Sequence, residues 1–393
     1  MNALISHLLG HLRLLPLMLC AALAACGTTP SAPPPSELFN DASFRAPAAP
    51  VDARLALAPS PAMREYVRVD LSRAARSRNP RRALAMTLYD KAGLKLEYEA
   101  SMTRTAAQAF DARSGNCLSL VLMTAALARE MGLEVQYQTV LGEESWSRDG
   151  DTYFVAGHVN LVLGRRLGQN ADSYDADASL LIDFLPAEDL TGQRTRLISE
   201  STILAMYLNN RAAETMAGGD LDQAYWFARA AIVQEPSFAG AFNTLGIIQL
   251  RHGDLDAAQR TLAHALERSP ANTVLLSNLA QALDRLGRGS EARLLRSRLL
   301  ALQPEPPFHF FNLGRLAMQQ GDYQGAARLF QREIARDPDY HEFHFWLAKA
   351  HAQLGQWPQA GRQLELAMQS STLRGDQALY AGKLQRLRAA GVQ

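Results

Sequence analysis

The chain has 393 residues, of which 48% are hydrophobic and 20% are charged, so it is long enough for two or three globular domains. Its 40 basic and 39 acidic side chains give a formal net charge of +1, which provides no field over the whole molecule that would attract a phosphate backbone. These values exclude collagen-like, disordered and multi-spanning membrane proteins, and nucleic acid is not expected as a partner.

The first 25 residues have the pattern of a processing signal. An apolar run from Leu14 to Ala25 is too short to span a bilayer permanently, and it ends in small residues. The segment Leu23-Ala24-Ala25-Cys26-Gly27 resembles the lipobox of bacterial lipoproteins. The resemblance implies cleavage after residue 25, lipidation of Cys26 and an envelope protein held by acyl chains. Gly27 favours the outer membrane, with the protein facing the periplasm; an ordinary secretory signal is the alternative.

Residues 26–58 are predicted to form a lipidated tether. Proline recurs through this segment, at Pro30, Pro33, Pro34, Pro35, Pro47 and Pro50. Proline-rich segments without an apolar period form extended or flexible linkers. The tether is expected to hold the folded part away from the membrane.

The next region, residues 59–200, has the mixed pattern of an α+β domain. The pattern predicts a helix over about residues 61–92, a strand at 94–98, and a helix that begins after Thr103 or Thr105 and ends near Arg113. The break Ser114-Gly115-Asn116 precedes Cys117, which opens a long apolar helix over 118–131. Further strands are expected at 134–141, 158–163 and 180–184, with a hairpin turn at Asp149-Gly150.

Cys117 is the candidate nucleophile of this region. Cys20 lies in the signal and Cys26 is expected to carry lipid, which leaves Cys117 as a solitary thiol. In an oxidising envelope, structural disulfides use cysteines in pairs, so this thiol is either a small buried hydrophobic group or a reactive one. At the first turn of a helix, unpaired N–H groups and the positive end of the macrodipole stabilise a thiolate.

A nucleophile of this kind needs a base and a third group that orients the base. His158 opens a strand after Gly157, and Asp183 lies in an apolar strand where a carboxylate is costly unless it is paired. The other candidate orienting residues are Asn160, Asp172, Asp175 and Asp177. His158 has no second His or Cys at metal-ligand spacing, and no glycine-rich phosphate loop is present, so neither a metal nor a cofactor is expected.

Four segments together resemble the transglutaminase-like superfamily over about residues 95–190. They are Ser114-Gly115-Asn116-Cys117-Leu118-Ser119, the helix end Ala128-Arg129-Glu130-Met131-Gly132-Leu133, Gly157-His158-Val159 and Ile182-Asp183-Phe184. The resemblance implies a papain-like α+β core with Cys117 as nucleophile, His158 as base and Asp183 as its orienting group. It also implies peptide or amide hydrolysis more than transamidation. Phe184 stands where the family often has proline, and the sequence identifies no side chain for an oxyanion hole.

Trp146 and Tyr153 flank the loop before His158. These two residues either wall a substrate cleft or pack a hairpin.

The C-terminal half repeats with a period of 34 residues. Three residue series share that spacing: Gly219, Gly253, Gly287, Gly321 and Gly355; Ala224, Ala258, Ala292, Ala326 and Ala360; and Pro236, Pro270, Pro304 and Pro338. Each unit is predicted to be a helix, a turn with Gly, a second helix packed closely at Ala, and a Pro that stops it. Five such units cover residues 205–374, and residues 375–393 are expected to form a C-terminal capping helix.

This pattern resembles the tetratricopeptide repeat (TPR), apart from Arg211 and Thr372, which stand where the end units should carry Leu and Pro. The resemblance implies an all-α superhelix, or α-solenoid, whose groove binds a protein or peptide partner. The groove is expected to be lined by Phe242, Phe310, Phe311, His344 and Trp346, unless these residues pack between helices. The sequence therefore favours an enzyme coupled to a binding array; a non-catalytic adaptor that acts in envelope complex assembly is the alternative.

Overall fold

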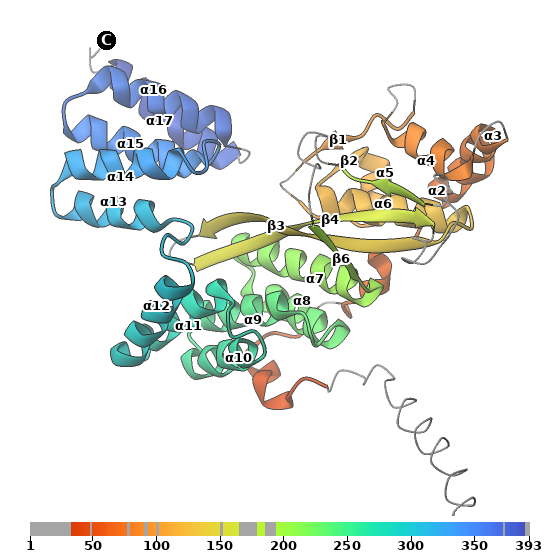
Figure 1. The fold of residues 1–393 in the computed structure, drawn as a ribbon, viewed down its shortest axis with the longest axis horizontal. Helices are drawn as coiled ribbons and strands as arrows, with labels where there is room; N and C mark the ends of the chain where they lie inside the picture. Colours follow the sequence, from red (N-terminus) through yellow and green to blue (C-terminus); the bar gives the residue numbers. More distant parts are fainter. Residues whose placement is uncertain are drawn as a thin grey trace, which may run out of the picture.

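The computed structural model describes residues 33–47, 49–76, 79–89, 93–99, 102–149, 152–164, 179–184, 194–371 and 374–389. The expected signal peptide, Cys26 and the alternative residues Asp172, Asp175 and Asp177 lie outside these ranges. None of the described helices combines the length and the apolar composition that a bilayer span requires. A region of sheet and helices lies beside a long array of paired helices (Figure 1).

The main sheet has four antiparallel strands in the order β5-β4-β3-β6. Its strands are β3 (Val135–Asp149), β4 (Thr152–Gly164), β5 (Ser179–Ile182) and β6 (Arg194–Ile198). Strands β3 and β4 form a long hairpin that reaches across the array as far as helix α11 (Figure 1). Asp149 ends β3 as the predicted turn requires, whereas Gly150 lies outside the described residues. The sequence did not predict β6, because this short edge strand carries exposed Arg194.

Helix α6 (Cys117–Glu130) is the buried centre of the sheet region. It packs against β3 and β4, with α5 (Ala106–Ala112) beside it, and every residue from Leu118 to Ala128 is buried. A helix that is apolar on all sides is stable only when neighbours cover all of its faces. A small parallel pair, β1 (Glu97–Tyr98) and β2 (Ser114–Gly115), precedes the helix. The predicted helix at this position is therefore confirmed, with Cys117 as its first residue.

The helix predicted over residues 61–92 is divided into several elements. They are α2 (Pro61–Tyr66), a π-helical turn (Val67–Leu71), α3 (Ser72–Ala75) and α4 (Pro80–Tyr89). Pro80 has no backbone N–H and cannot continue a preceding helix, so α4 starts anew there. The predicted helical structure is therefore confirmed over residues 61–75 and 80–89, and Pro80 divides it.

The array consists of five antiparallel helix pairs followed by a last helix. The pairs are α7 (Glu200–Ala217) with α8 (Leu221–Gln234), α9 (Ala239–His252) with α10 (Leu255–Arg268), α11 (Thr273–Arg285) with α12 (Gly289–Leu302), α13 (His309–Gln319) with α14 (Tyr323–Ile334), and α15 (His341–Gln353) with α16 (Trp357–Ser370), and the last helix is α17 (Arg374–Ala389). The glycine of each turn has a positive φ, for example 101° at Gly253. The alanine series is fully buried, as close packing of the second helix requires.

Gly246 on α9 is needed for close contact with α10. A Cβ atom at this position would lie 2.6 Å from Cγ of Leu262. Although alanine normally favours a helix over glycine, we expect Gly246→Ala to lower the free energy of unfolding by about 1 to 3 kcal/mol through overpacking. Chemical denaturation measures the change. Gly382→Ala on α17 is the control, because a Cβ there meets nothing within 4 Å. Equal stability of both variants and the wild type would contradict the prediction.

The segment that precedes the sheet region is packed against the first two repeats. It contains three short 3-10 helices: Ser36–Leu38, Asp41–Ser43 and Ala53–Ala56. The ring of Phe44 stacks on Tyr225 at 4.0 Å, and Asp41 accepts hydrogen bonds from Tyr225 and Arg229. The prediction of a flexible tether over residues 26–58 is therefore wrong for these residues. The prediction relied on the proline content of the segment and did not consider the aromatic and charged side chains that anchor it.

The array is interrupted between α12 and α13. One apolar cluster extends through the sheet region and the repeats as far as Ala292, and a separate cluster begins at Phe308. Of the 14 residues of α12, only Ala292 is buried. Arg296 stands 34 residues after Leu262 and 34 before Phe330, so a charged side chain occupies a position that is otherwise apolar. Leu313 on α13, at a position that is buried in the second and third units, is 41% exposed.

Candidate functional site

The loop before α6 fixes the position of Cys117 at the start of that helix. Asn116 is the N-cap residue, and its side-chain Oδ1 accepts the N–H of Ser119 at 2.9 Å. The N–H groups of Cys117 and Leu118 belong to the first turn, where no intrahelical acceptor exists. Cys117 is partly buried and forms no disulfide. The thiol therefore lies at the positive end of a long helix with two first-turn N–H groups beside it.

His158 and Asp183 form a buried pair next to this thiol. Strand β4 carries His158 and pairs with β5, which ends just before Asp183. His158 Nε2 lies 2.7 Å from Asp183 Oδ1, and the side chains are 7% and 2% exposed. Cys117 lies near enough to the ring for its side chain to raise the pKa of His158. The ring thus lies between the thiol and the carboxylate, and the structure brings together the three residues that the sequence singled out.

Asn160 and Tyr89 hold Asp183 in place. Asn160 Nδ2 donates to Asp183 Oδ2 at 2.8 Å, and the hydroxyl of Tyr89 donates to the main-chain oxygen of Asp183. Asn160 is buried two residues beyond His158 on the same strand, so both side chains point to the same face of the sheet. Asn160, an alternative candidate for the orienting group, instead hydrogen-bonds to the carboxylate.

The charges around His158 favour its protonated form. Burial lowers its pKa, but the hydrogen bonds and charges of Asp183 and Cys117 outweigh burial and raise the pKa from 6.5 to about 9. At neutral pH the ring is therefore an imidazolium paired with the Asp183 carboxylate. Such a ring can donate a proton to a leaving group.

Tyr98 is a neighbour of Cys117 that the sequence did not reveal. Strand pairing places Tyr98 opposite Gly115, two residues before the cysteine. Tyr98 is 59% exposed, but partial desolvation and the nearby Cys117 raise the pKa of its hydroxyl, which therefore stays protonated at neutral pH. The signal for its placement was weak, because the predicted strand at 94–98 forms only two residues of pairing.

The predicted cleft wall at Trp146 and Tyr153 lies outside the part of the chain whose side chains are described. Among the described residues, no group of three His, Cys, Asp or Glu side chains is arranged to hold a metal ion.

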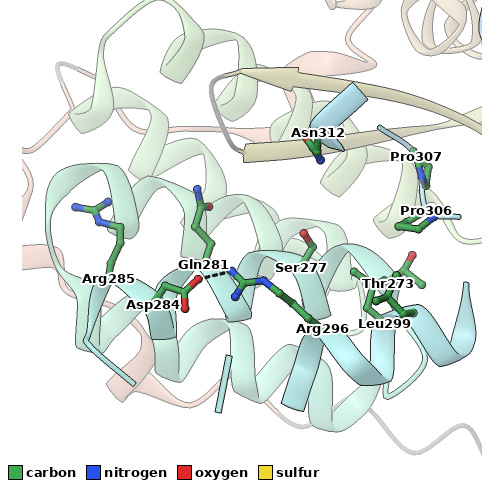
Figure 2. A pocket seen from close by; sticks show the side chains of 11 residues that line it. Thr273, Ser277, Gln281, Asp284, Arg285, Arg296, Leu299, Pro306, Pro307 and Asn312 are labelled. Carbon is green, nitrogen blue, oxygen red and sulfur yellow. Dashed lines mark hydrogen bonds and ion pairs between the residues drawn. The ribbon is translucent and has the colours of Figure 1, made fainter. Parts of the chain in front are cut away.

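A groove opens where the array is interrupted, between α11, α12 and α13 (Figure 2). It has a volume of about 580 Å³. Polar side chains from Ser277, Gln281 and Asn312 face apolar ones from Leu299 and the two prolines before α13 (Figure 2). An ion pair joins Asp284 of α11 to Arg296 of α12 in the lining of the groove (Figure 2). The full lining is Thr273, Ser277, Gln281, Asp284, Arg285, Arg296, Leu299, Leu300, Pro306, Pro307 and Asn312.

The aromatic residues expected to line a binding groove are instead part of the packing between helices. Phe242, Phe310, Phe311 and His344 are buried. Trp346 is partly buried, and the Lys349 ammonium lies 3.7 Å from the centre of its ring. The packing alternative therefore holds for all five residues, because the ring of Trp346 also contacts Phe311 and Phe330.

Comparison with known proteins supports the assignment of the C-terminal half as tetratricopeptide repeats. Two family models described as tetratricopeptide repeat match residues 249–309 and 311–372. A TPR repeat-containing protein of Pseudomonas aeruginosa is 28% identical over 174 residues, which cover 40% of this chain and 30% of that protein. Protein FlbA of Caulobacter vibrioides is 26% identical over 190 residues, covering 48% and 31%. The chain thus spans less than a third of the length of these relatives.

Among solved structures, the chain is similar to a TPR protein of Thermus thermophilus, at 19% identity and a TM-score of 0.37. That match covers 46% of this chain and 99% of the other. From the period, the paired helices and the two family matches together, the C-terminal part of this chain is an all-helical array of tetratricopeptide repeats.

Proposed function

We propose that the chain is a cysteine-dependent acyl-transfer protein whose repeats bind a protein or peptide. One observation carries the proposal: the ring of His158 is hydrogen-bonded to buried Asp183 and lies near Cys117, which is the first residue of α6. A thiol, a base and an orienting carboxylate in this order are the parts that a cysteine nucleophile requires.

In the proposed reaction, Cys117 attacks as a thiolate paired with the His158 imidazolium, and its sulfur adds to the carbonyl carbon of a peptide or amide bond. The new C–S bond forms as the C–N bond breaks, and the imidazolium of His158 donates its proton to the leaving amine. The N–H groups of Cys117 and Leu118 stabilise the oxyanion during the attack. Water then attacks the thioester: its oxygen bonds to the acyl carbon as the C–S bond breaks, His158 takes one proton of the water, and the thiolate–imidazolium pair is restored. Capture of the thioester by a second amine gives transamidation instead.

The sheet region supports the proposed similarity to the transglutaminase-like superfamily. Its chain order of Cys117 on a helix, His158 on a strand and Asp183 at the next strand is the order that the transglutaminase-like resemblance implies. We propose a papain-like core on that basis, with hydrolysis of a peptide or amide bond preferred over transamidation. No step requires a cofactor.

The proposed location follows from the sequence of residues 23–27. A lipid on Cys26 would anchor the protein in the bacterial envelope, at the outer membrane and facing the periplasm. The membrane is then a partner through acyl chains alone. Mass spectrometry of the mature N-terminus tests this part, because an unmodified residue 26, or a chain that still carries residues 1–25, would exclude it.

The competing function is a non-catalytic TPR adaptor. It is favoured by the extent of the family matches, which cover residues 249–372 and none of the sheet region. In this case the sheet region serves as a platform, and function resides in the repeats.

Labelling with a peptide electrophile separates the two functions. The full-length protein is treated with peptides that end in a vinyl sulfone, and modification of Cys117 is followed in the tryptic fragment of residues 114–129, in which it is the only cysteine. An acyl-transfer site should react far faster than free cysteine, and faster with the peptide reagent than with a plain vinyl sulfone. Rates equal to those of free cysteine for both reagents would favour the adaptor.

A further inference from the structure

The first helix of the array touches the loop that precedes the cysteine helix. Glu214 on α7 accepts the backbone N–H of Thr103 at 2.7 Å, and Asn210, one turn earlier, donates to Thr103 Oγ1 at 3.2 Å. Thr103 is 1% exposed, so neither contact is exchanged for water. Two residues of a repeat helix thus hold one buried residue of the sheet region.

Thr103 in turn holds the residue that caps the cysteine helix. Asn116 Nδ2 donates to Thr103 Oγ1 at 2.8 Å, while Asn116 Oδ1 accepts from both the N–H and the hydroxyl of Ser119. Ser119 Oγ also accepts the N–H of Arg104 at 2.8 Å. Hydrogen bonds therefore run without a gap from α7, through Thr103, to the first turn of α6, where Cys117 lies.

The loop that contains Thr103 and Asn116 has little room to move relative to α6 and α7. A Cβ atom at Gly115 would lie 2.6 Å from Cβ of Ser119, so the loop is pressed against the helix start. Glu214 is partly buried, and its carboxylate pairs with Arg211 at 2.8 Å. Removing this carboxylate would leave a buried N–H at Thr103 without an acceptor, and a loop in that situation shifts to regain one. A shift of the loop moves Asn116 and, with it, the first turn of α6.

We propose that Asn210 and Glu214 are positioning residues for Cys117. The first repeat helix sets the place of Thr103, Thr103 sets the side chain of Asn116, and Asn116 fixes the helix turn that carries the sulfur. This inference rests on the proposed function in one respect, which is that Cys117 is taken as the nucleophile. It follows that the repeats are part of the reactive site and not only a separate binding module.

The test uses full-length variants and two measurements. The first is the rate at which Cys117 reacts with the peptide vinyl sulfone, and the second is amide hydrogen exchange over residues 114–120. We expect Glu214→Ala to slow labelling about 10- to 100-fold, because a displaced nucleophile loses its near-attack geometry. Exchange at the first turn of α6 should rise in the same variant. Asn210→Ala should act in the same direction with a smaller effect, because Asn116 still contacts Thr103.

Two further variants separate positioning from general destabilisation. Glu214→Gln keeps an oxygen that can accept the Thr103 N–H and should restore most of the labelling rate. Glu333→Ala is the matched control, because Glu333 on α14 also accepts backbone N–H groups, from Phe310 and Phe311, and pairs with an arginine three residues away. It lies in a repeat that does not contact α6, so labelling of Cys117 should stay at the wild-type rate.

The inference is overturned if Glu214→Ala and Asn210→Ala both leave labelling and exchange unchanged, or if Glu333→Ala slows labelling as much as Glu214→Ala does. Hydrogen exchange reports the placement of the helix turn whether or not the sulfur is a nucleophile. It therefore distinguishes a failure of this link from a failure of the proposed chemistry.

Discussion

Replacing His158 by alanine is expected to reduce acyl transfer by about 10²- to 10⁴-fold, the usual contribution of a positioned acid or base. The ring lies near Cys117 and is protonated at neutral pH, so in the proposed reaction it balances the charge of the attacking sulfur and carries the proton for the leaving amine. The alanine variant loses both effects. The measurement is the single-turnover rate of Cys117 acylation, together with its rate of alkylation by a small reagent.

The rate of alkylation should fall less than the rate of acylation in this variant, because alkylation needs the thiolate but no proton for a leaving amine. The control is His344→Ala, which removes another buried histidine with two hydrogen-bond partners, Gln363 and Pro338, far along the array. Loss of stability without loss of reactivity is expected there. If His158→Ala alkylates and acylates at the wild-type rates, His158 is not the base.

Replacing Asp183 by alanine is expected to lower the free energy of unfolding by about 3 to 5 kcal/mol, as is usual when one partner of a buried charged pair is removed. The carboxylate is 2% exposed and accepts hydrogen bonds from both His158 and Asn160, so its loss leaves two buried side chains without their acceptor. Denaturant unfolding measures the change. Asp183→Asn keeps the shape and loses the charge, so it separates the two contributions; wild-type stability in both variants would contradict the prediction.

The pH dependence of stability gives the same pair an independent test. The folded pKa of His158, about 9, lies above its ordinary value of 6.5. A raised pKa means that the folded state binds the proton more tightly, so this contribution to stability is fully present below pH 6.5 and is lost as the pH rises through about 9. In Asp183→Asn the charge that raises the pKa is gone, and the decline between these two values should flatten.

The repeats were predictable because each of their constraints is local. Gly253 supplies a left-handed turn, Ala258 a close helix contact and Pro270 a helix stop; Gly and Ala return in all five units, and Pro returns in the first four. Constraints of this kind can be recognised in the sequence as a regular spacing of residue types. The interruption after α12 is marked in the sequence by Arg296, which stands in an otherwise apolar series, and by the consecutive prolines Pro306 and Pro307.

The candidate site was predictable only in part. Cys117 could be found from its position after a helix break, and Asp183 from its apolar surroundings, because both signals are carried by immediate neighbours in the chain. The contacts of Thr103 with Glu214 and Asn210 join residues more than a hundred positions apart, and no spacing rule reports such a pairing. The anchoring of residues 36–45 on α8 was missed for the same reason, since it depends on the distant Tyr225.

Because of the interruption between α12 and α13, we expect the protein to unfold as two separate cooperative units. In a solenoid, stability is approximately a sum over units and over the couplings between nearest neighbours, so one weak coupling separates two melting units. Helices α7 to α12 share an apolar cluster with the sheet region, whereas α13 to α15 build a cluster of their own. The distal repeats can therefore lose their structure while the cysteine, its histidine and the proximal repeats remain folded as a single block.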